Sequence, residues 1–245
     1  MTINTMLNCR RALAFGVLGI LVGCAAPGTG VDRPAASAAW PERTEVADAR
    51  GYRVDRAASM LHVRVDAAGS MARFGHSHII GGAVIEGTIQ RAPDLTDSAL
   101  DLVVHVPDLV VDDPAWRRVH GLDAELDPAA IEGTRTNLLG PRVLDAERYP
   151  LIAIRSVAIS GPDWAPVVTL RVRLHDQVRE FAVPITLHED AGTLVASGHF
   201  AFDHADFGLE PFSALGGSLR VSERIETRFR IVAGADRASG EVARR

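Results

Sequence analysis

The chain has 245 residues, of which 47% are hydrophobic, 23% are charged and 5% are aromatic, and its formal net charge is -5. This composition excludes a wholly disordered chain, and the length is enough to bury a substantial core. The acidic balance argues against a nucleic-acid-binding protein, which would need a basic face. Two cysteines, Cys9 and Cys24, are too few for a disulfide scaffold.

Residues 1–23 are typical of a signal peptide. Arg10 and Arg11 form a positive start, and an uncharged apolar run follows at residues 12–22. As a helix this run would extend about 17 Å, well short of a hydrocarbon core of about 30 Å. We therefore predict a cleaved signal rather than a membrane span.

Residues 21–24 (LVGC) resemble the bacterial lipobox. The resemblance implies that Cys24 is lipidated and that the protein is anchored to a membrane, since each buried methylene contributes about 0.8 kcal/mol. The alternative is ordinary secretory cleavage with Cys24 incidental. Ala25 in place of Asp implies sorting to the outer membrane, so we expect an anchored protein on the periplasmic side of the bacterial envelope. Residues 24–50, rich in Ala, Pro, Gly and Ser, are predicted to be its lipidated tether.

From residue 51 onward, apolar and polar residues alternate with a period of two, which indicates antiparallel strands with one polar face. The clearest alternating segments are 61–65, 100–106, 170–174, 181–187, 200–202 and 229–231. A short turn at Asp176-Gln177 is expected to join two of them as a hairpin. Residues 234–245 are polar and are expected to be a disordered tail.

One segment in the middle of the chain has a helical pattern instead. Asp127 is a good N-cap, Pro128 suits the first helical position, and Gly140 would end the helix. A shorter helical turn is expected at 116–121. We therefore predict an all-β fold, an antiparallel barrel of about eight strands with a helical insertion, as one domain at residues 51–233.

Several short segments occur in a distinctive order along this region. They are the strand from Leu61 leading through Gly81-Gly82 to residues 86–89 (EGTI), residues 137–139 (NLL) with 143–146 (VLDA), residues 149–152 (YPLI) running to 155–156 (RS), the hairpin 174–181 (LHDQVREF) and residues 206–209 (DFGL). In this order, over about residues 52–232, they resemble the YceI-like family of periplasmic proteins. The resemblance implies a lipocalin-like barrel whose apolar interior binds a polyisoprenoid, such as a quinone or a prenyl phosphate.

The chain departs from the family pattern at three places. Asp176 replaces a hairpin glycine, His204 replaces a basic residue, and residues 74–78 (FGHSH) form a Gly-His-x-His variant. The resemblance implies a membrane-anchored carrier or buffer that holds an isoprenoid lipid. The residues expected to contact the ligand are Phe74, Leu138, Leu139, Phe207 and Phe212 along its chain, and His76, His78 or Arg135 near its polar head. The alternative is that the interior side chains only pack against each other.

His76 and His78 also suggest a second function. Residues two apart on a strand point to the same face, so both rings could reach one metal or haem iron. Zinc usually takes three or four ligands, and His62, His199 or His204 would have to supply a third. The protein would then be a redox accessory, with a membrane cytochrome as its partner by analogy only. The alternative is an exposed or hydrogen-bonded pair.

Known enzyme motifs offer no further candidate. Asp206-Phe207-Gly208 is not a kinase motif here because the chain has no lysine, and we expect Asp206 to cap a bend, Phe207 to plug the interior and Gly208 to adopt an unusual backbone angle. No nucleophile elbow or phosphate-binding glycine loop occurs, so we predict a protein that is not an enzyme.

Basic residues at 117–120 and Arg135 lie in or beside the helical region. They could hold an anionic head group at the barrel mouth. More often such residues form surface ion pairs, here with Asp123, Glu125 or Glu132, each worth at most about 1 kcal/mol, and we favour this interpretation.

Overall fold

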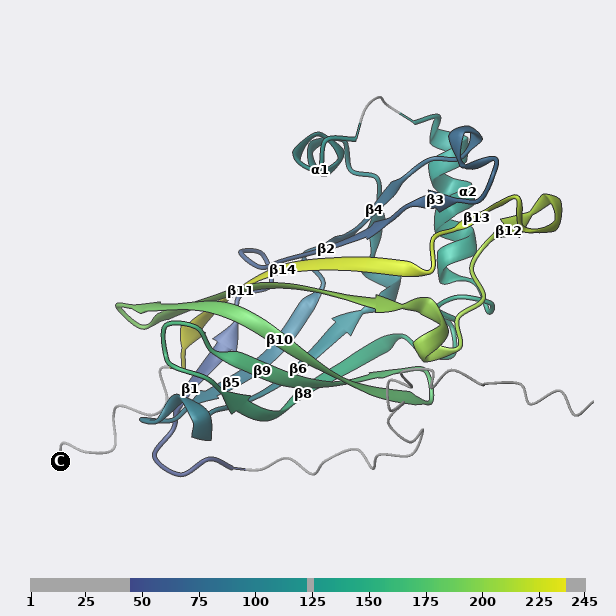
Figure 1. The fold of residues 1–245 in the computed structure, drawn as a ribbon. Helices are drawn as coiled ribbons and strands as arrows, with labels where there is room; N and C mark the ends of the chain where they lie inside the picture. Colours follow the sequence, from purple (N-terminus) through teal and green to yellow (C-terminus); the bar gives the residue numbers. More distant parts are fainter. Residues whose placement is uncertain (1–44, 123–125, 237–245) are drawn as a thin grey trace, which may run out of the picture. The chain divides into compact units, whose positions relative to one another are not determined.

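Eight antiparallel strands close into a barrel in the computed structural model, which describes residues 45–122 and 126–236 (Figure 1). In ring order they are β1 (Arg50–Val54), β5 (Ile85–Arg91), β6 (Ala99–His105), β8 (Leu151–Ser160), β9 (Val167–Leu174), β10 (Gln177–Asp190), β11 (Thr193–Asp203) and β14 (Arg224–Ala235). The ring closes because β1 pairs with β14 as well as with β5. This confirms the predicted all-β, lipocalin-like fold.

The alternation read from the sequence becomes the division between the inside and the outside of the barrel. Along β9, Val168, Leu170, Val172 and Leu174 are buried, and the residues between them are less buried. Such a pattern fixes the register, since a slip by one residue would turn every apolar side chain outward. The barrel therefore has an aliphatic interior.

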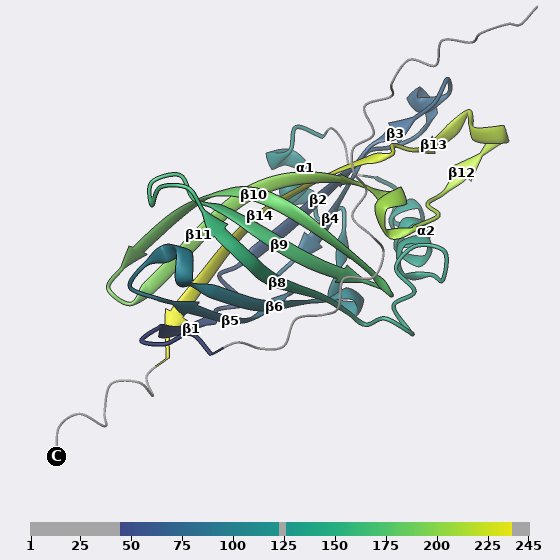
Figure 2. The same cartoon turned by 60° about the horizontal axis from the view of Figure 1, so that its bottom comes forward.

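The barrel is modified at its seam. One end of β14 pairs with β1, at Ala233–Ala235, and the other pairs with β2 (Met60–Val65), at Glu226–Arg230. β2 pairs in turn with β4 (His78–Gly82), and β4 pairs with β7 (Val110–Val111). These three strands extend the sheet away from the closed ring. β2 runs along β14 in both views, and β4 lies beyond β2 (Figures 1 and 2).

Two helices lie against this extension of the sheet. α2 (Pro128–Leu139) begins at its predicted N-cap, where Asp127 accepts a hydrogen bond from the amide of Ala129 at 2.8 Å. α1 (Pro114–Val119) starts two residues earlier than predicted, because Asp113 caps it and Pro114 takes the first position. No helix among the residues described combines the length and apolar character needed to cross a bilayer.

A second, small sheet projects from the end of the barrel at which α2 lies (Figure 2). It consists of β3 (Ala67–Ala68), β13 (Leu219–Val221) and β12 (Ser213–Ala214), with the 3-10 turns η1 (Ala72–Phe74) and η5 (Leu215–Gly217). We call residues 67–75 and 211–221 together the arm.

The predicted hairpin turn was wrong by one residue. Leu174 pairs with Gln177, so the two turn residues are His175 and Asp176. His175, rather than Asp176, takes the left-handed backbone conformation, with φ at 52°. A short hairpin needs such a conformation to match the twist of its strands.

The segment from Asp206 to Gly208 adopts its predicted structural roles. It belongs to η4 (His204–Phe207), where the Asp206 carboxylate accepts a hydrogen bond from the amide of Asp203 at 3.1 Å. Phe207 is buried in the barrel interior, and Gly208 takes a left-handed φ of 67°.

Several predictions concern the ends of the chain. β14 continues to Ala235, two residues into the segment that the sequence assigned to the tail. β1 begins at Arg50, the last residue of the predicted tether. The signal peptide and Cys24 lie outside the described residues and stay predictions.

Candidate functional site

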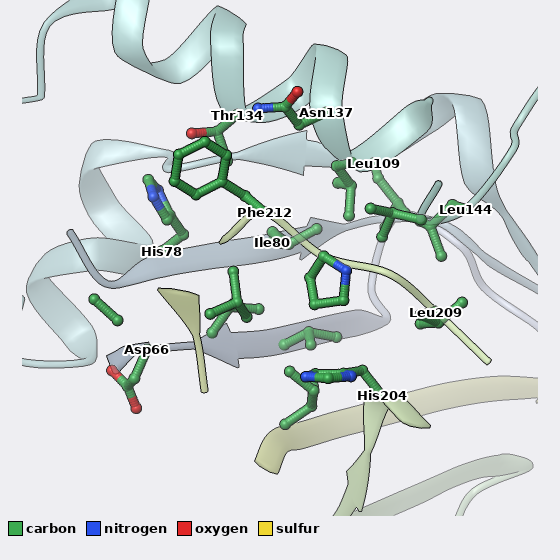
Figure 3. A pocket seen from close by; sticks show the side chains of 18 of the residues that line it. Asp66, His78, Ile80, Leu109, Thr134, Asn137, Leu144, His204, Leu209 and Phe212 are labelled. Carbon is green, nitrogen blue, oxygen red and sulfur yellow. The ribbon is translucent and has the colours of Figure 1, made fainter. Parts of the chain in front are cut away.

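A chamber of about 500 Å³ opens between the extended strands, α2 and the arm (Figure 3). This volume is within the range of small-molecule sites, roughly 300–1,000 Å³. Its walls are mainly apolar, with Ile80 from β4, Leu109 from the loop before β7, and Leu144 from the loop after α2. We call this space the outer chamber.

A second cavity of about 160 Å³ lies in the barrel interior. Its lining is aliphatic and phenylalanine side chains, with Thr227 as the exception among the described residues. We call it the inner chamber. The linings of the two chambers share six residues, which are Leu61, Val63, Val104, Ile152, Leu174 and Phe202. The two spaces therefore adjoin, and together they lead from the surface into the barrel.

Phenylalanine rings form one wall of the inner chamber. Phe207 lies 6.0 Å from Phe181 and 5.6 Å from Phe202 between ring centroids, and Phe200 is 5.4 Å from Phe181. These separations are within the range of favourable aromatic contacts. Five of the chain's eight phenylalanines line this chamber, although the chain as a whole has few aromatic residues.

Polar side chains are gathered in the outer chamber. Figure 3 shows Asp66 and His78 on one side, His204 on another, and Thr134 and Asn137 from α2 above them. Polar side chains therefore lie on several sides of the outer chamber, and we call them together its polar region.

His78 is held by a buried carboxylate behind the chamber wall. Its Nδ1 donates to Oδ2 of Asp112 at 2.6 Å, and Asp112 also accepts from the amide of Ile79 at 3.0 Å and from Nη1 of Arg117 at 2.7 Å. Burial alone would raise the pKa of Asp112, but these hydrogen bonds outweigh it and lower the pKa. An ionised carboxylate only accepts, so Nδ1 of His78 carries a proton.

Among the residues that the structure describes, Asp66 is the one acidic residue in the lining of the outer chamber. Burial alone would raise its pKa, but hydrogen bonds from Arg64 and Ser77 lower it. Nε of Arg64 is 3.0 Å from Oδ2 of Asp66. Because Arg64 compensates this carboxylate, the polar region does not present an unpaired negative charge to a ligand.

His204 contributes an unusual polar atom. Its Nδ1 is buried and has no hydrogen-bond partner within the described part of the chain. Buried polar atoms are nearly always hydrogen-bonded, so this nitrogen is an exception to that rule.

The residues predicted to contact the ligand line the outer chamber, the inner chamber or neither. Phe74, His76, His78, Leu138 and Phe212 line the outer chamber. Phe207 lines the inner chamber.

Arg135 and Leu139 lie outside the lining of both chambers. The Arg135 guanidinium donates to the carbonyl oxygens of Leu109 at 2.6 Å and Pro107 at 3.0 Å, and so ties α2 to the loop before β7. Leu139 packs against the hydrophobic core.

His76 and His78 do not lie on one strand, although the sequence predicted that they would. His78 begins β4, but His76 precedes the strand, and the two ring centroids are 6.4 Å apart. His62 packs against Trp116 and His120 instead, and His199 is exposed on β11. In residues 45–122 and 126–236, no group of three or more His, Cys, Asp or Glu side chains is arranged to hold a metal ion. Metal or haem at this pair stays a prediction.

Arg117 was wrongly expected at a surface. It is 6% exposed, and it forms an ion pair with Asp112. Its Nη1 also donates to the carbonyl of Ser77 at 2.8 Å. The residue thus braces the segment that carries His76 and His78. Asp123 and Glu125 lie outside the described residues.

Sequence reasoning missed Asp112 as well as the contributions of Thr134 and Asn137. The two α2 residues could have been found, because Thr134, Asn137 and Leu138 recur at spacings of three and four on one helix face. Asp112 carries no local signal, since only the pairing of β4 with β7 buries it.

The architecture defines a class, an antiparallel β-barrel with an apolar interior that opens to the surface through a partly polar chamber. Residues 52–233 match the model of the YceI-like domain, and the chain belongs to this family.

Solved structures agree on the fold. Burkholderia cenocepacia BcnA is similar with a TM-score of 0.56 and 15% identity, covering 73% of this chain and 98% of its own. A polyisoprenoid binding domain from Saccharophagus degradans, implicated in plant cell wall breakdown, is similar with a TM-score of 0.53 and 14% identity, covering 76% and 98%. No protein with a curated description matches this chain.

Proposed function

We propose that this protein binds an isoprenoid lipid, with the chain of the lipid in the inner chamber and its polar head in the outer chamber. The observation that carries the proposal is the junction of the two spaces. An apolar cavity inside the barrel meets a chamber that adds His78, Asn137 and His204 to apolar walls. A long lipid with one polar end matches this division of chemistry.

The inner chamber favours a hydrocarbon ligand over a polar one. Burying apolar surface contributes roughly 25 cal/mol per Å², whereas a polar group buried without a partner costs about 1–3 kcal/mol. The family assignment and the similarity to a polyisoprenoid binding domain support an isoprenoid as that hydrocarbon.

The polar region suits a quinone or a prenyl phosphate. Asp112 holds Nδ1 of His78 as a donor, so Nε2 is the ring nitrogen left for a ligand. In its neutral form Nε2 accepts from a hydroxyl, and in its protonated form it donates to a carbonyl or phosphate oxygen. The amide of Asn137 and the ring of His204 belong to the same lining.

We further propose that the protein is a carrier or buffer without chemistry of its own, anchored through an acylated Cys24 on the periplasmic side of a bacterial envelope. The lipobox-like residues 21–24 and the tether composition of residues 24–50 support this location.

Binding of isoprenoid alcohols of increasing length tests the proposed function. The affinity should rise with each added isoprene unit until the inner chamber is filled and should then level off. A straight-chain alcohol of equal carbon number should bind more weakly if the chamber selects the branched chain. An affinity that is independent of length, or no binding at all, would contradict the proposal.

A further inference from the structure

Three large apolar side chains of the arm are exposed. Phe74 is 56% exposed, Phe212 is 50% exposed and Leu215 is 65% exposed. Single exposed apolar residues are common on soluble proteins, but a group of them at a cavity mouth marks an interaction surface.

The arm is a folded unit that holds these residues together. Ala68 pairs with Arg220 in its small sheet, and the amide of Met71 donates to the carbonyl of Ser218 at 2.8 Å. A Cβ at Gly75 would lie 3.0 Å from Cδ1 of Leu219, so the two segments are closely packed. The apolar side chains therefore belong to one surface rather than to independent loops.

The charge on the arm has one sign. Residues 67–75 and 211–221 contain no aspartate or glutamate, although 31 acidic residues occur in the whole chain. Arg73 and Arg220 lie in these segments, and the guanidinium carbon of Arg73 is 4.4 Å from the ring centroid of Phe74. Aromatic and aliphatic side chains beside arginines are typical of surfaces that enter an anionic membrane interface.

The exposed surface is continuous with the proposed binding site. Phe74, Phe212 and Arg220 line the outer chamber as well as belonging to the arm. An isoprenoid that left a bilayer at the arm would meet apolar side chains from the interface to the inner chamber.

We propose that the arm docks onto the surface of a bilayer containing anionic lipid, and that the isoprenoid passes between the bilayer and the outer chamber at this contact. The inference rests on the proposed lipid-binding function. It adds the partner surface and the orientation in which the chamber meets the membrane.

An environment-sensitive dye at position 215 tests the proposal. The full-length chain carries Cys9→Ser, Cys24→Ser and Leu215→Cys, labelled with a nitrobenzoxadiazole group, and is mixed with phosphatidylcholine vesicles containing 30% phosphatidylglycerol. The matched control carries Trp164→Cys in place of Leu215→Cys. Trp164 is 85% exposed and lies in the turn before β9, at the end of that strand away from the chamber residue Leu174.

The dye at position 215 should become brighter, shift to the blue and be quenched by lipids spin-labelled near the head group, whereas the dye at position 164 should not. No change at position 215, or equal changes at both positions, would overturn the docking surface. A change at position 215 that depends on protein concentration without vesicles would mean that two copies meet there, and would also overturn it.

Charge variants test the same surface. Arg73→Gln and Arg220→Gln should each weaken vesicle binding about fivefold, which corresponds to about 1 kcal/mol per basic residue near an anionic surface. Arg53→Gln is the control, because Arg53 pairs with Gly234 near the opposite end of β14. Equal effects of all three variants would contradict a specific arm contact. If docking fails while a lipid is retained on purification, only the docking surface is wrong.

Discussion

His78 lines the outer chamber, and its ring donates to the fully buried carboxylate of Asp112. Asp112 itself does not line the chamber. Arg117 completes the arrangement from α1 and is itself nearly buried. A residue proposed to meet the ligand head is thus positioned by an ion pair behind the wall. Asp112 takes a left-handed backbone conformation, with φ at 57°, which aspartate tolerates better than most residues.

The substitution Asp112→Asn should destabilise the protein by about 3 kcal/mol, because it removes the buried carboxylate charge that accepts from both His78 and Arg117. Urea unfolding followed by circular dichroism measures this change. Glu180→Gln is the matched control, since Glu180 forms a more exposed ion pair with Arg171 and should cost less than about 1 kcal/mol. Equal costs for the two variants would contradict a structural role of the Asp112 pair.

Stability should fall as the pH drops below neutrality because of His62 and His120. Nδ1 of His62 is 3.0 Å from Nε2 of His120. Burial and then the charge of His120 lower the pKa of His62, while burial and then Arg228 and Arg64 lower the pKa of His120. The unfolded chain takes up protons near the ordinary pKa of about 6.5, whereas the folded chain resists them.

This loss begins as the pH falls through the unfolded value and ends once the lower folded values are passed. Each histidine contributes a slope of at most about 1.4 kcal/mol per pH unit. Unfolding measured between pH 7.5 and 5.5 should show a smaller slope for His62→Gln than for the parent. His188→Gln, at an exposed position on β10, should keep the parental slope. A slope that His62→Gln leaves unchanged would refute this assignment.

Gly133 offers a way to narrow the outer chamber without disturbing the fold. It lies in α2 and in the lining, and a Cβ built there meets no heavy atom within 4 Å. Gly133→Phe should weaken isoprenoid binding about tenfold, or roughly 1.4 kcal/mol, by occupying space that the ligand needs. Gly133→Ala should leave the affinity unchanged and stabilise the helix by up to about 1 kcal/mol. Equal affinities for the two variants would argue against this entry route.

Lipidation of Cys24 is testable separately. Cells grown with an alkyne-tagged fatty acid should label the parent and a Cys9→Ser variant, whereas Cys24→Ser should lose the label, because its hydroxyl cannot replace the acylated sulfur. Retained label in Cys24→Ser would contradict the anchor and would leave the lipid-binding chambers unaffected.

Local patterns predicted those parts of the fold that depend on local chemistry. Alternation placed the strands at Leu100 and Leu170, and the Asp127-Pro128 pair placed the start of α2. The hairpin turn was displaced because either His175 or Asp176 could take the left-handed conformation.

The seam depends on pairings that no short pattern contains. β7 is only Val110–Val111, and its partner β4 lies about thirty residues away in sequence. The burial of Asp112 and Arg117 follows from this pairing, so the support of His78 could not be predicted. Chamber residues such as Phe74 and Phe212 were found through the family resemblance, whereas the exposure that suggests membrane docking required the structure.

Native mass spectrometry of the protein purified in mild detergent from its own membranes tests the central claim most directly. The proposed function predicts a complex with one bound lipid, whose mass and fragments identify an isoprenoid quinone or prenyl phosphate, and a reduced fraction of that complex in Gly133→Phe. A ligand-free spectrum, together with no binding when isoprenoids are added back, would contradict isoprenoid binding in the barrel.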